Sequence, residues 1–116
     1  MKFALLIYEN EEQWAERDLP EKRDAYWGSW MAFGGAVADV NTGGAALLGP
    51  ETATTVRVRD GHRQVQDGPF PEAKEQLGGF FLIDVEDLDA ALAWAERCPN
   101  ASGCAVEVRP VMMEMD

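Results

Sequence analysis

The sequence predicts an α+β fold of the ferredoxin-like type, in which two helices cover one face of an antiparallel sheet. Two stretches with bulky apolar residues on both faces, Lys2–Tyr8 and Leu77–Val85, are typical of central strands. Each of them is followed by a segment whose apolar residues recur at the spacing of an amphipathic helix. The predicted order is therefore strand, helix, short strand and hairpin, strand, helix, strand, which is the β-α-β-β-α-β pattern with an inserted hairpin.

The first strand, Lys2 to Tyr8, carries Phe3, Leu5 and Ile7 on one side and Ala4, Leu6 and Tyr8 on the other. The following segment, Glu9 to Asp18, is polar and predicts a loop or a short helical turn. Pro20 suits the first position of a helix. An apolar stripe then runs along one helix face, widened by Trp27 and Met31: Tyr26, Trp30, Phe33 and Val37. The segment Asn41–Gly44 is expected to end this helix.

A short strand, Ala45–Leu48, precedes an alternating segment, Thr52–Arg59, and the turn Asp60-Gly61, which is a strong hairpin signal. A two-residue turn places Arg59 opposite His62, Arg57 opposite Gln64 and Val56 opposite Val65. One face of the hairpin is thus polar and basic, and the other carries valines that we expect to face the helices.

The second half of the chain repeats the strand and helix pattern. Asp87 is predicted to cap the second helix, whose buried stripe is Leu88, Ala91, Leu92 and Ala95. Cys98-Pro99 ends that helix. The last strand, Ala105–Met112, alternates valines with Glu107 and Arg109. The uncovered sheet face, which carries Phe3 or Ala4 and Phe80 or Phe81, remains substantially apolar, so we predict a homodimer with the two sheets packed face to face.

The composition limits the classes of function. The 116 residues predict one domain, 1–116, and 21 acidic against 10 basic residues give a net charge of −11, which disfavours direct binding to nucleic acid or anionic membranes. The apolar opening is too short for a signal peptide or a membrane span, so a cytoplasmic location is expected. With one His and two cysteines, Cys98 and Cys104, no metal-site spacing is present, and no cofactor is predicted. The cysteines favour reduced thiols over a disulfide.

Several motifs in order resemble the YCII-related family, in its DGPF branch. They are Lys2–Tyr8, Thr54–Arg57, Asp60-Gly61, Asp67-Gly68-Pro69-Phe70 with Lys74-Glu75, Gly78–Phe80, Trp94-Ala95 with Cys98-Pro99, and Glu107–Val111. The resemblance implies a ferredoxin-like subunit and a dimeric α+β barrel. Members of the wider group are thought to use a helix-borne His and the Asp of an Asp-Pro pair. This chain has Tyr26 and Trp27 near the first position and Cys98-Pro99 at the second, so a His/Asp mechanism is not carried over.

The candidate site residues from the sequence are polar groups near the Asp67 motif and on the strands. Asp67 is either a catalytic base or an acceptor of local backbone N–H groups. Lys74 is a candidate for binding an anionic substrate and Glu75 for acid–base chemistry, although charges flanking a strand are often merely solvated. Arg57, Glu107 and Arg109 are expected on the open sheet face, where they either grip a carboxylate or phosphate or form an ion pair between subunits. Glu72 lies in the same motif.

Two functions follow as hypotheses. The first is a pocket at the dimer barrel for a small anionic metabolite, either binding or catalytic, which leaves open whether the protein is an enzyme. The second, implied by the resemblance, is a non-enzymatic accessory protein associated with an extracytoplasmic-function sigma factor. Tyr8 and Tyr26 are interpreted as packing residues, and His62 as an exposed residue after the hairpin turn.

Overall fold

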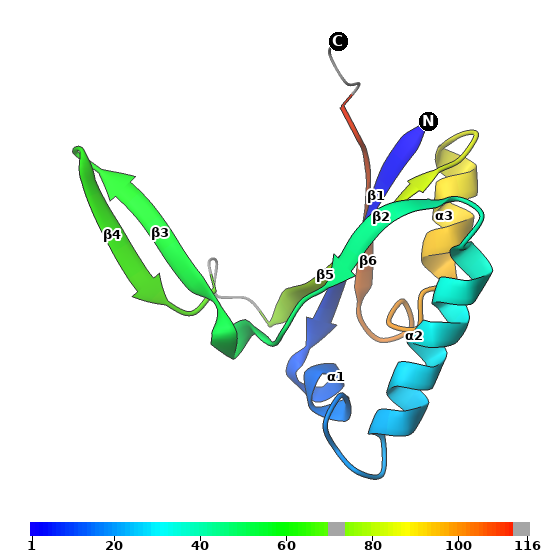
Figure 1. Cartoon of the computed structure of the whole chain (residues 1–116), viewed down its shortest axis with the longest axis horizontal. Coiled ribbons are helices and arrows are strands. Elements are labelled where there is room, and N and C mark those ends of the chain that lie inside the picture. The colour runs from blue at the N-terminus through cyan, green and yellow to red at the C-terminus, as the bar shows by residue number, and fades with distance from the viewer. Residues whose placement is uncertain (70–73, 113–116) are drawn as a thin grey trace.

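The computed structural model describes residues 1–69 and 74–112 and contains a four-stranded antiparallel sheet with helices on one side (Figure 1). The elements are β1 (Lys2–Asn10), α1 (Glu11–Glu16), α2 (Arg23–Val37), β2 (Asn41–Ala46), a short 3-10 helix (Pro50–Thr52), β3 (Thr54–Arg59), β4 (His62–Asp67), β5 (Glu75–Asp84), α3 (Leu88–Glu96) and β6 (Ala105–Pro110). The sheet order is β2-β5-β1-β6, and β3 and β4 form a separate two-stranded sheet. The α+β, ferredoxin-like prediction is confirmed. Within the described residues, no helix is long and apolar enough to cross a membrane.

The core lies between the sheet and helices α2 and α3. Alternate residues of the central strand β1 point into it, and Phe3, Leu5 and Ile7 are each at most 3% exposed. Phe33 and Val37 from α2 and Ala91 and Ala95 from α3 close the other side of this core. Burying this face of β1 removes apolar surface from water, which stabilises the fold by about 25 cal/mol for each Å² buried. The core therefore explains why this strand has the central place that its sequence predicts.

The opposite face of the sheet is also apolar, and its side chains are only partly buried by the described residues. In the strand register, Leu6 lies opposite Phe80 and Ala4 opposite Leu82. Cross-strand partners point to the same side of a sheet, so these residues share the face away from the helices. We call the face formed by Ala4, Leu6, Phe80 and Leu82 the open face.

Helix α2 differs from its prediction in its first residue and in its apolar face. Helix α2 begins at Arg23 rather than Pro20, and Met31 is 78% exposed instead of widening the apolar stripe. Trp30 and Phe33 both contact the ring of Phe81, at centroid distances of 6.3 and 5.1 Å. This packing sets the rotation of α2 and leaves Met31, the next residue after Trp30, on the outside.

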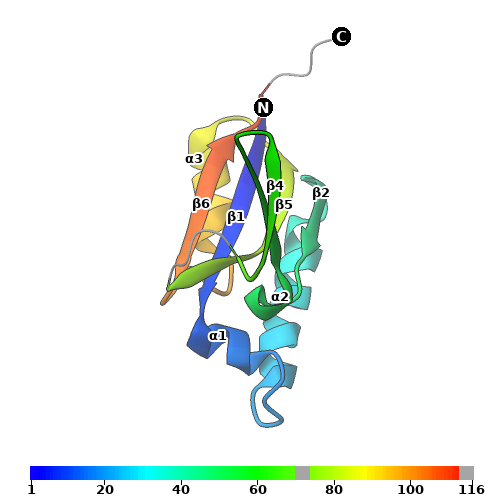
Figure 2. The same ribbon diagram turned by 90° about the vertical axis from the view of Figure 1, so that its left-hand side faces the viewer.

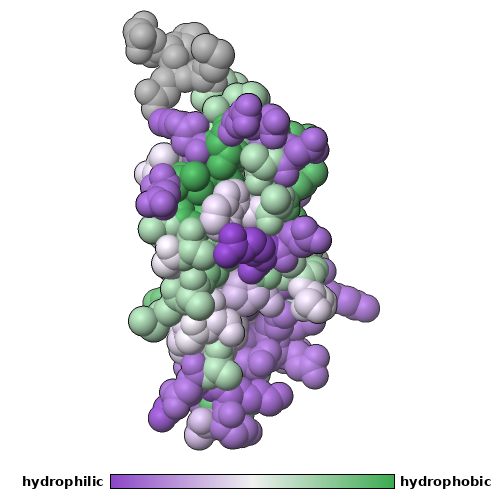
Figure 3. Space-filling view, turned by 90° about the vertical axis from the view of Figure 1, so that its right-hand side faces the viewer, coloured by the Kyte–Doolittle hydropathy of each residue, from purple (hydrophilic) through white to green (hydrophobic). Residues whose placement is uncertain are grey.

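In α3 the Asp87 cap is confirmed, because its carboxylate accepts a hydrogen bond from the Ala90 N–H at 2.9 Å. However, Leu88 and Leu92 are about half exposed, while the small Ala91 and Ala95 lie against the sheet. The alanines let α3 approach closely and leave the leucines at its flank. Figure 3 shows hydrophobic side chains in the upper part of this helix side and mostly hydrophilic ones below.

The predicted hairpin register is confirmed in full, including the Val56–Val65 pair and a turn at Asp60 and Gly61 with positive φ angles. The prediction that its valines face the helices is wrong, because β3 and β4 do not join the main sheet. The hairpin instead projects from the molecule on the side of the open face (Figures 1 and 2). The short strand also differs from its prediction: β2 spans Asn41–Ala46, so Asn41–Gly44 already pairs with β5.

Candidate functional site

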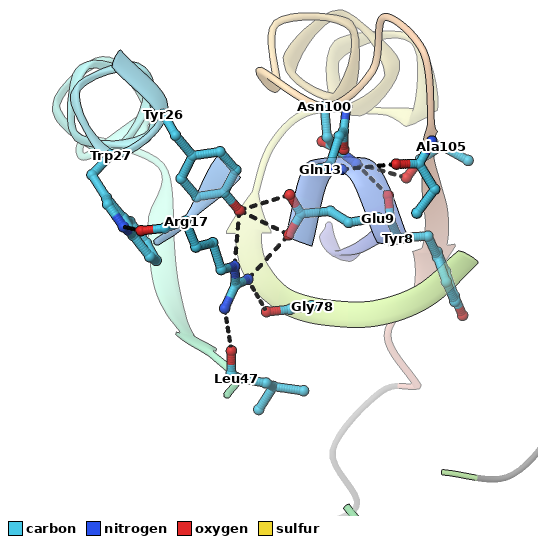
Figure 4. A network of polar contacts seen from close by, with 11 residues as sticks. Tyr8, Glu9, Gln13, Arg17, Tyr26, Trp27, Leu47, Gly78, Asn100 and Ala105 are labelled. Atoms are coloured by element: carbon cyan, nitrogen blue, oxygen red, sulfur yellow. Dashed lines mark hydrogen bonds and ion pairs between the residues drawn. The ribbon is translucent and has the colours of Figure 1, made fainter. Parts of the chain in front are cut away.

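A buried carboxylate, a guanidinium and a phenol meet at the end of the sheet nearest α1 (Figure 4). The Glu9 side chain is 1% exposed and lies 3.0 Å from the Arg17 Nη2. The Tyr26 hydroxyl donates to the Glu9 carboxylate, with oxygens at 2.6 and 2.9 Å, and accepts from the Arg17 Nε at 3.1 Å. Each member of this Glu9–Arg17–Tyr26 cluster therefore contacts the other two.

Local structure explains how the cluster forms. Glu9 continues the alternation of β1, so its side chain points to the same side as Ile7. Asn10 then caps α1 by accepting a hydrogen bond from the Gln13 N–H at 2.9 Å. One short helix later, Arg17 returns over the strand end, where its guanidinium stacks on the Trp14 ring at 3.8 Å from the centroid.

The backbone around Arg17 is fitted to its guanidinium. Arg17 Nη1 donates to the Leu47 carbonyl at 2.6 Å, and Nη2 donates to the Gly78 carbonyl at 3.3 Å. A Cβ atom on Gly78 would lie 2.7 Å from Glu9 Oε1 and 3.2 Å from the Trp14 ring. The cluster therefore requires glycine at position 78 because there is no room for a side chain.

The cluster forms one wall of a cavity of about 340 Å³ between α2 and the β2–β5 side of the sheet. Aromatic rings from Trp27, Trp30 and Phe81 line much of the rest, and residues 43–46 of β2 complete it. A volume of this size is at the lower end of the range for small-molecule sites. The cavity thus combines an apolar, ring-lined interior with one hydrogen-bonding, charged end.

Glu9 and Tyr26 also line a second cavity, of about 160 Å³, on the far side of the cluster. Asn100 lies in its wall and is 2% exposed. The Asn100 amide nitrogen donates to the Tyr8 and Ala105 carbonyls, both at 2.9 Å, which identifies the other amide atom as oxygen. That buried oxygen and the amide oxygen of Gln13 have no hydrogen-bond partner among the described residues. An occupant of this cavity has to donate hydrogen bonds to satisfy them.

The environment of Tyr26 keeps its hydroxyl protonated. Burial raises the pKa of Tyr26 well above 10, and the neighbouring Glu9 carboxylate raises it further, while Arg17 opposes the shift. A neutral phenol that donates to a carboxylate can pass a proton along this hydrogen bond. The cluster therefore holds the elements of an acid–base pair at the edge of the cavity.

This pKa predicts a pH dependence that absorbance can measure. In a Tyr8→Phe variant, Tyr26 is the one remaining tyrosine, and its tyrosinate absorbance is expected to stay absent above pH 10 until the fold is lost. Because the folded pKa exceeds the unfolded value, this group's contribution to stability is complete below pH 10 and falls as the pH rises beyond it. Titration of Tyr26 near pH 10 in the folded protein would contradict the prediction.

The candidate site residues predicted from the sequence lie outside the Glu9–Arg17–Tyr26 cluster. Arg57 and Asp67 belong to the β3–β4 hairpin, so the expectation that Arg57 lies on the open face of the main sheet is wrong. Lys74 precedes β5 and Glu75 begins it. Arg109 pairs with Ala4 and Glu107 with Leu6, so these two side chains lie on the open face, as expected. None of these candidate residues lines the 340 Å³ cavity, and their functional roles stay predictions. Phe70 and Glu72 of the motif lie outside the described residues.

The part of the Asp67 motif that is described serves as a turn. Gly68 has φ of +101°, a conformation that glycine adopts readily, and its N–H donates to the Ala53 carbonyl at 2.7 Å. Its own carbonyl accepts from the Thr55 hydroxyl at 2.6 Å. The turn therefore anchors the end of β4 to the start of β3.

Sequence reasoning missed Glu9 and Arg17 because it assigned both to a polar segment after the strand. A signal was present, since extending the alternation of β1 by two residues places Glu9 on the core side. Cys98 and Cys104 are free thiols, and burial raises the pKa of Cys98 to about 12, which makes it a poor nucleophile.

Comparisons with known proteins agree with this fold. The family model described as the YCII-related domain matches residues 1–115. An uncharacterized protein of Rhizobium meliloti (strain 1021) is 49% identical over 74 residues, which are 61% of this chain, and the chain spans 60% of that relative's length. A solved structure of 5-chloro-2-hydroxyhydroquinone dehydrochlorinase (TftG) from Burkholderia phenoliruptrix AC1100, in complex with 2,5-dihydroxybenzoquinone, is similar with a TM-score of 0.60 and 15% identity. That similarity covers 98% of this chain and 96% of the other, and it concerns the fold alone. Because the family model spans nearly every residue, the chain belongs to the YCII-related family.

Proposed function

We propose that this protein binds a small planar ring compound with an acidic hydroxyl group and acts on it by acid–base chemistry. The observation that carries the proposal is the Glu9–Arg17–Tyr26 cluster at the end of a ring-lined cavity of about 340 Å³. Rings stack on or pack edge-on against aromatic side chains such as Trp27 and Trp30. A compound of this kind is one class of the small anionic metabolites that the sequence predicts.

Each member of the cluster has a distinct role in this proposal. Tyr26 accepts a hydrogen bond from the ligand hydroxyl through its remaining lone pair. As the ligand proton moves to the Tyr26 oxygen, the proton of Tyr26 moves to Glu9, and the reverse transfer returns it. Arg17 balances the charge of Glu9. The similar dehydrochlorinase, whose structure contains a dihydroxybenzoquinone, supports a ring compound as the ligand class.

The charges of the cavity favour a weakly acidic ligand over a strong polyanion. Arg17 already donates hydrogen bonds to Tyr26, Glu9, Leu47 and Gly78, so most of its N–H groups are engaged. A phosphate or a dicarboxylate would lie next to the Glu9 carboxylate with little of Arg17 left to compensate for the repulsion. A single hydroxyl needs one hydrogen bond, which Tyr26 can supply.

Calorimetric titration tests the proposal by comparing two groups of ligands. Hydroquinones and hydroxybenzoquinones are the expected ligands, and aliphatic dicarboxylates and phosphate esters are the negative controls. We expect binding of the ring compounds and a loss of about tenfold in affinity in Tyr26→Phe. This change preserves the ring and removes the hydroxyl, with its hydrogen bonds to the ligand, Glu9 and Arg17. Tyr8→Phe, a change of the same kind outside the cavity, is the matched control and is expected to bind as the wild type does. Binding of phosphate esters alone, or equal affinity in Tyr26→Phe, would reject this site.

We further propose a homodimer that packs the open faces of two copies together. Leu6, Phe80 and Leu82 supply the apolar surface for this contact. Light scattering on the 12.8 kDa chain at micromolar concentration is expected to give twice that mass. A monomer at that concentration would reject the dimer while leaving the ligand proposal untouched.

A further inference from the structure

The β3–β4 hairpin, residues 54–67, which we call the arm, has an apolar face that the described residues leave more than half exposed. Val56, Val58 and Val65 lie on one face of the arm and are 56%, 67% and 54% exposed. Gln64 and Gln66 lie on the other face. An isolated two-stranded hairpin is marginally stable in water and gains stability when its apolar face packs against another surface. The exposed valines therefore indicate a contact that one chain does not make.

The shape of the chain shows that the arm does not fold back onto its own body. The radius of gyration is 16.0 Å, whereas about 13 Å is typical of a compact domain of this length. Figures 1 and 2 agree that the arm stands off on the side of the open face, opposite the helices. A molecule that covers the open face thus lies on the same side as the arm.

The charges of the arm differ in sign from those of the body. The arm has three of the ten basic residues and two of the twenty-one acidic ones, which makes it net +1, while the rest of the chain is net −12. Arg63 lies on the valine face, opposite Val58. Asp67 also lies on the valine face, opposite Thr54, whereas Arg57 and Arg59 lie on the other face. The arm as a whole is therefore weakly basic with one apolar face, and its net charge is complementary to an acidic surface.

We propose that the arm is a clasp that lays its valine face on a second copy of this chain. The second copy is the occupant that fits, because its body is strongly acidic and its open face lies on the side to which the arm projects. By symmetry, each of two arms covers the opposite subunit. The clasp rests on the proposed homodimer and adds to it a contact that the sheet faces alone do not provide.

The test compares two sets of substitutions on the two faces of the arm. The triple variant Val56→Thr, Val58→Thr, Val65→Thr keeps the shape and strand preference of valine and adds a hydroxyl to each side chain. The matched control Gln64→Thr, Gln66→Thr changes the polar face. Sedimentation equilibrium is expected to show a dimer weakened about tenfold or more in the valine variant and unchanged in the control. Arg63→Glu is expected to weaken the dimer in the same direction, with an effect that salt reduces.

The outcomes separate the clasp from the dimer on which it rests. A monomeric wild type rejects both. A wild-type dimer with unchanged affinity in the valine variant rejects the clasp and leaves the open-face dimer standing. If that same variant instead loses binding to a sigma factor added as a purified protein, the arm serves a different partner, and the clasp is also rejected.

Discussion

Replacing Glu9 with alanine is expected to destabilise the protein by about 3 kcal/mol or more, because it leaves the Arg17 guanidinium without its carboxylate partner. The side chains of Glu9 and Arg17 are only 1% and 11% exposed, so water compensates poorly for the lost ion pair. The hydroxyl of Tyr26 loses its acceptor in the same step. The free energy of unfolding in urea measures the effect.

The control for this variant is Glu96→Ala, which removes an exposed carboxylate from the last turn of α3 and is expected to change the stability little. A second variant, Arg17→Met, and the double variant complete a thermodynamic cycle. The double variant is expected to be more stable than the sum of the single losses implies, because it leaves no unpaired charge. Additive losses would show that the two side chains do not interact.

Replacing Gly44 with alanine is expected to cost about 2–4 kcal/mol, because the backbone at this position suits only glycine. Gly44 has φ of +142°, and a Cβ atom there would collide with the carbonyl oxygen of Phe80 in the neighbouring strand. That atom belongs to the backbone and cannot turn aside. Strand β2 would have to separate from β5, and since both strands line the cavity, ligand affinity is expected to fall too.

Gly35→Ala in α2 is the matched control for this second prediction. A Cβ atom at Gly35 meets nothing within 4 Å, and alanine favours a helix more than glycine does by about 0.5–1 kcal/mol. Thermal unfolding should therefore shift upward in Gly35→Ala and downward in Gly44→Ala. Equal stability of the two variants would contradict the close approach of β2 to β5.

The fold can be predicted from the sequence more readily than the candidate site. Local sequence patterns predict the fold, such as Lys2–Tyr8 with apolar residues on both faces and the helix cap at Asp87. Each of these patterns depends only on residues close to it in the chain. The site consists of Glu9, Arg17 and Tyr26, whose chemistry depends on how β1, α1 and α2 pack together. A polar segment such as Glu9–Asp18 looks solvated in the sequence, although two of its charges are buried against each other.

The sequence by itself determined the order of elements, the register of the hairpin and the family. These follow from side-chain periodicity and turn chemistry, which act over a few residues. Only the tertiary structure decided that the hairpin leaves the sheet as an arm and that a buried ion pair and a phenol meet beside a cavity. The physical reason is that burial and pKa depend on which surfaces meet in space, and residues far apart in the chain, such as Glu9 and Gly78, create that environment together.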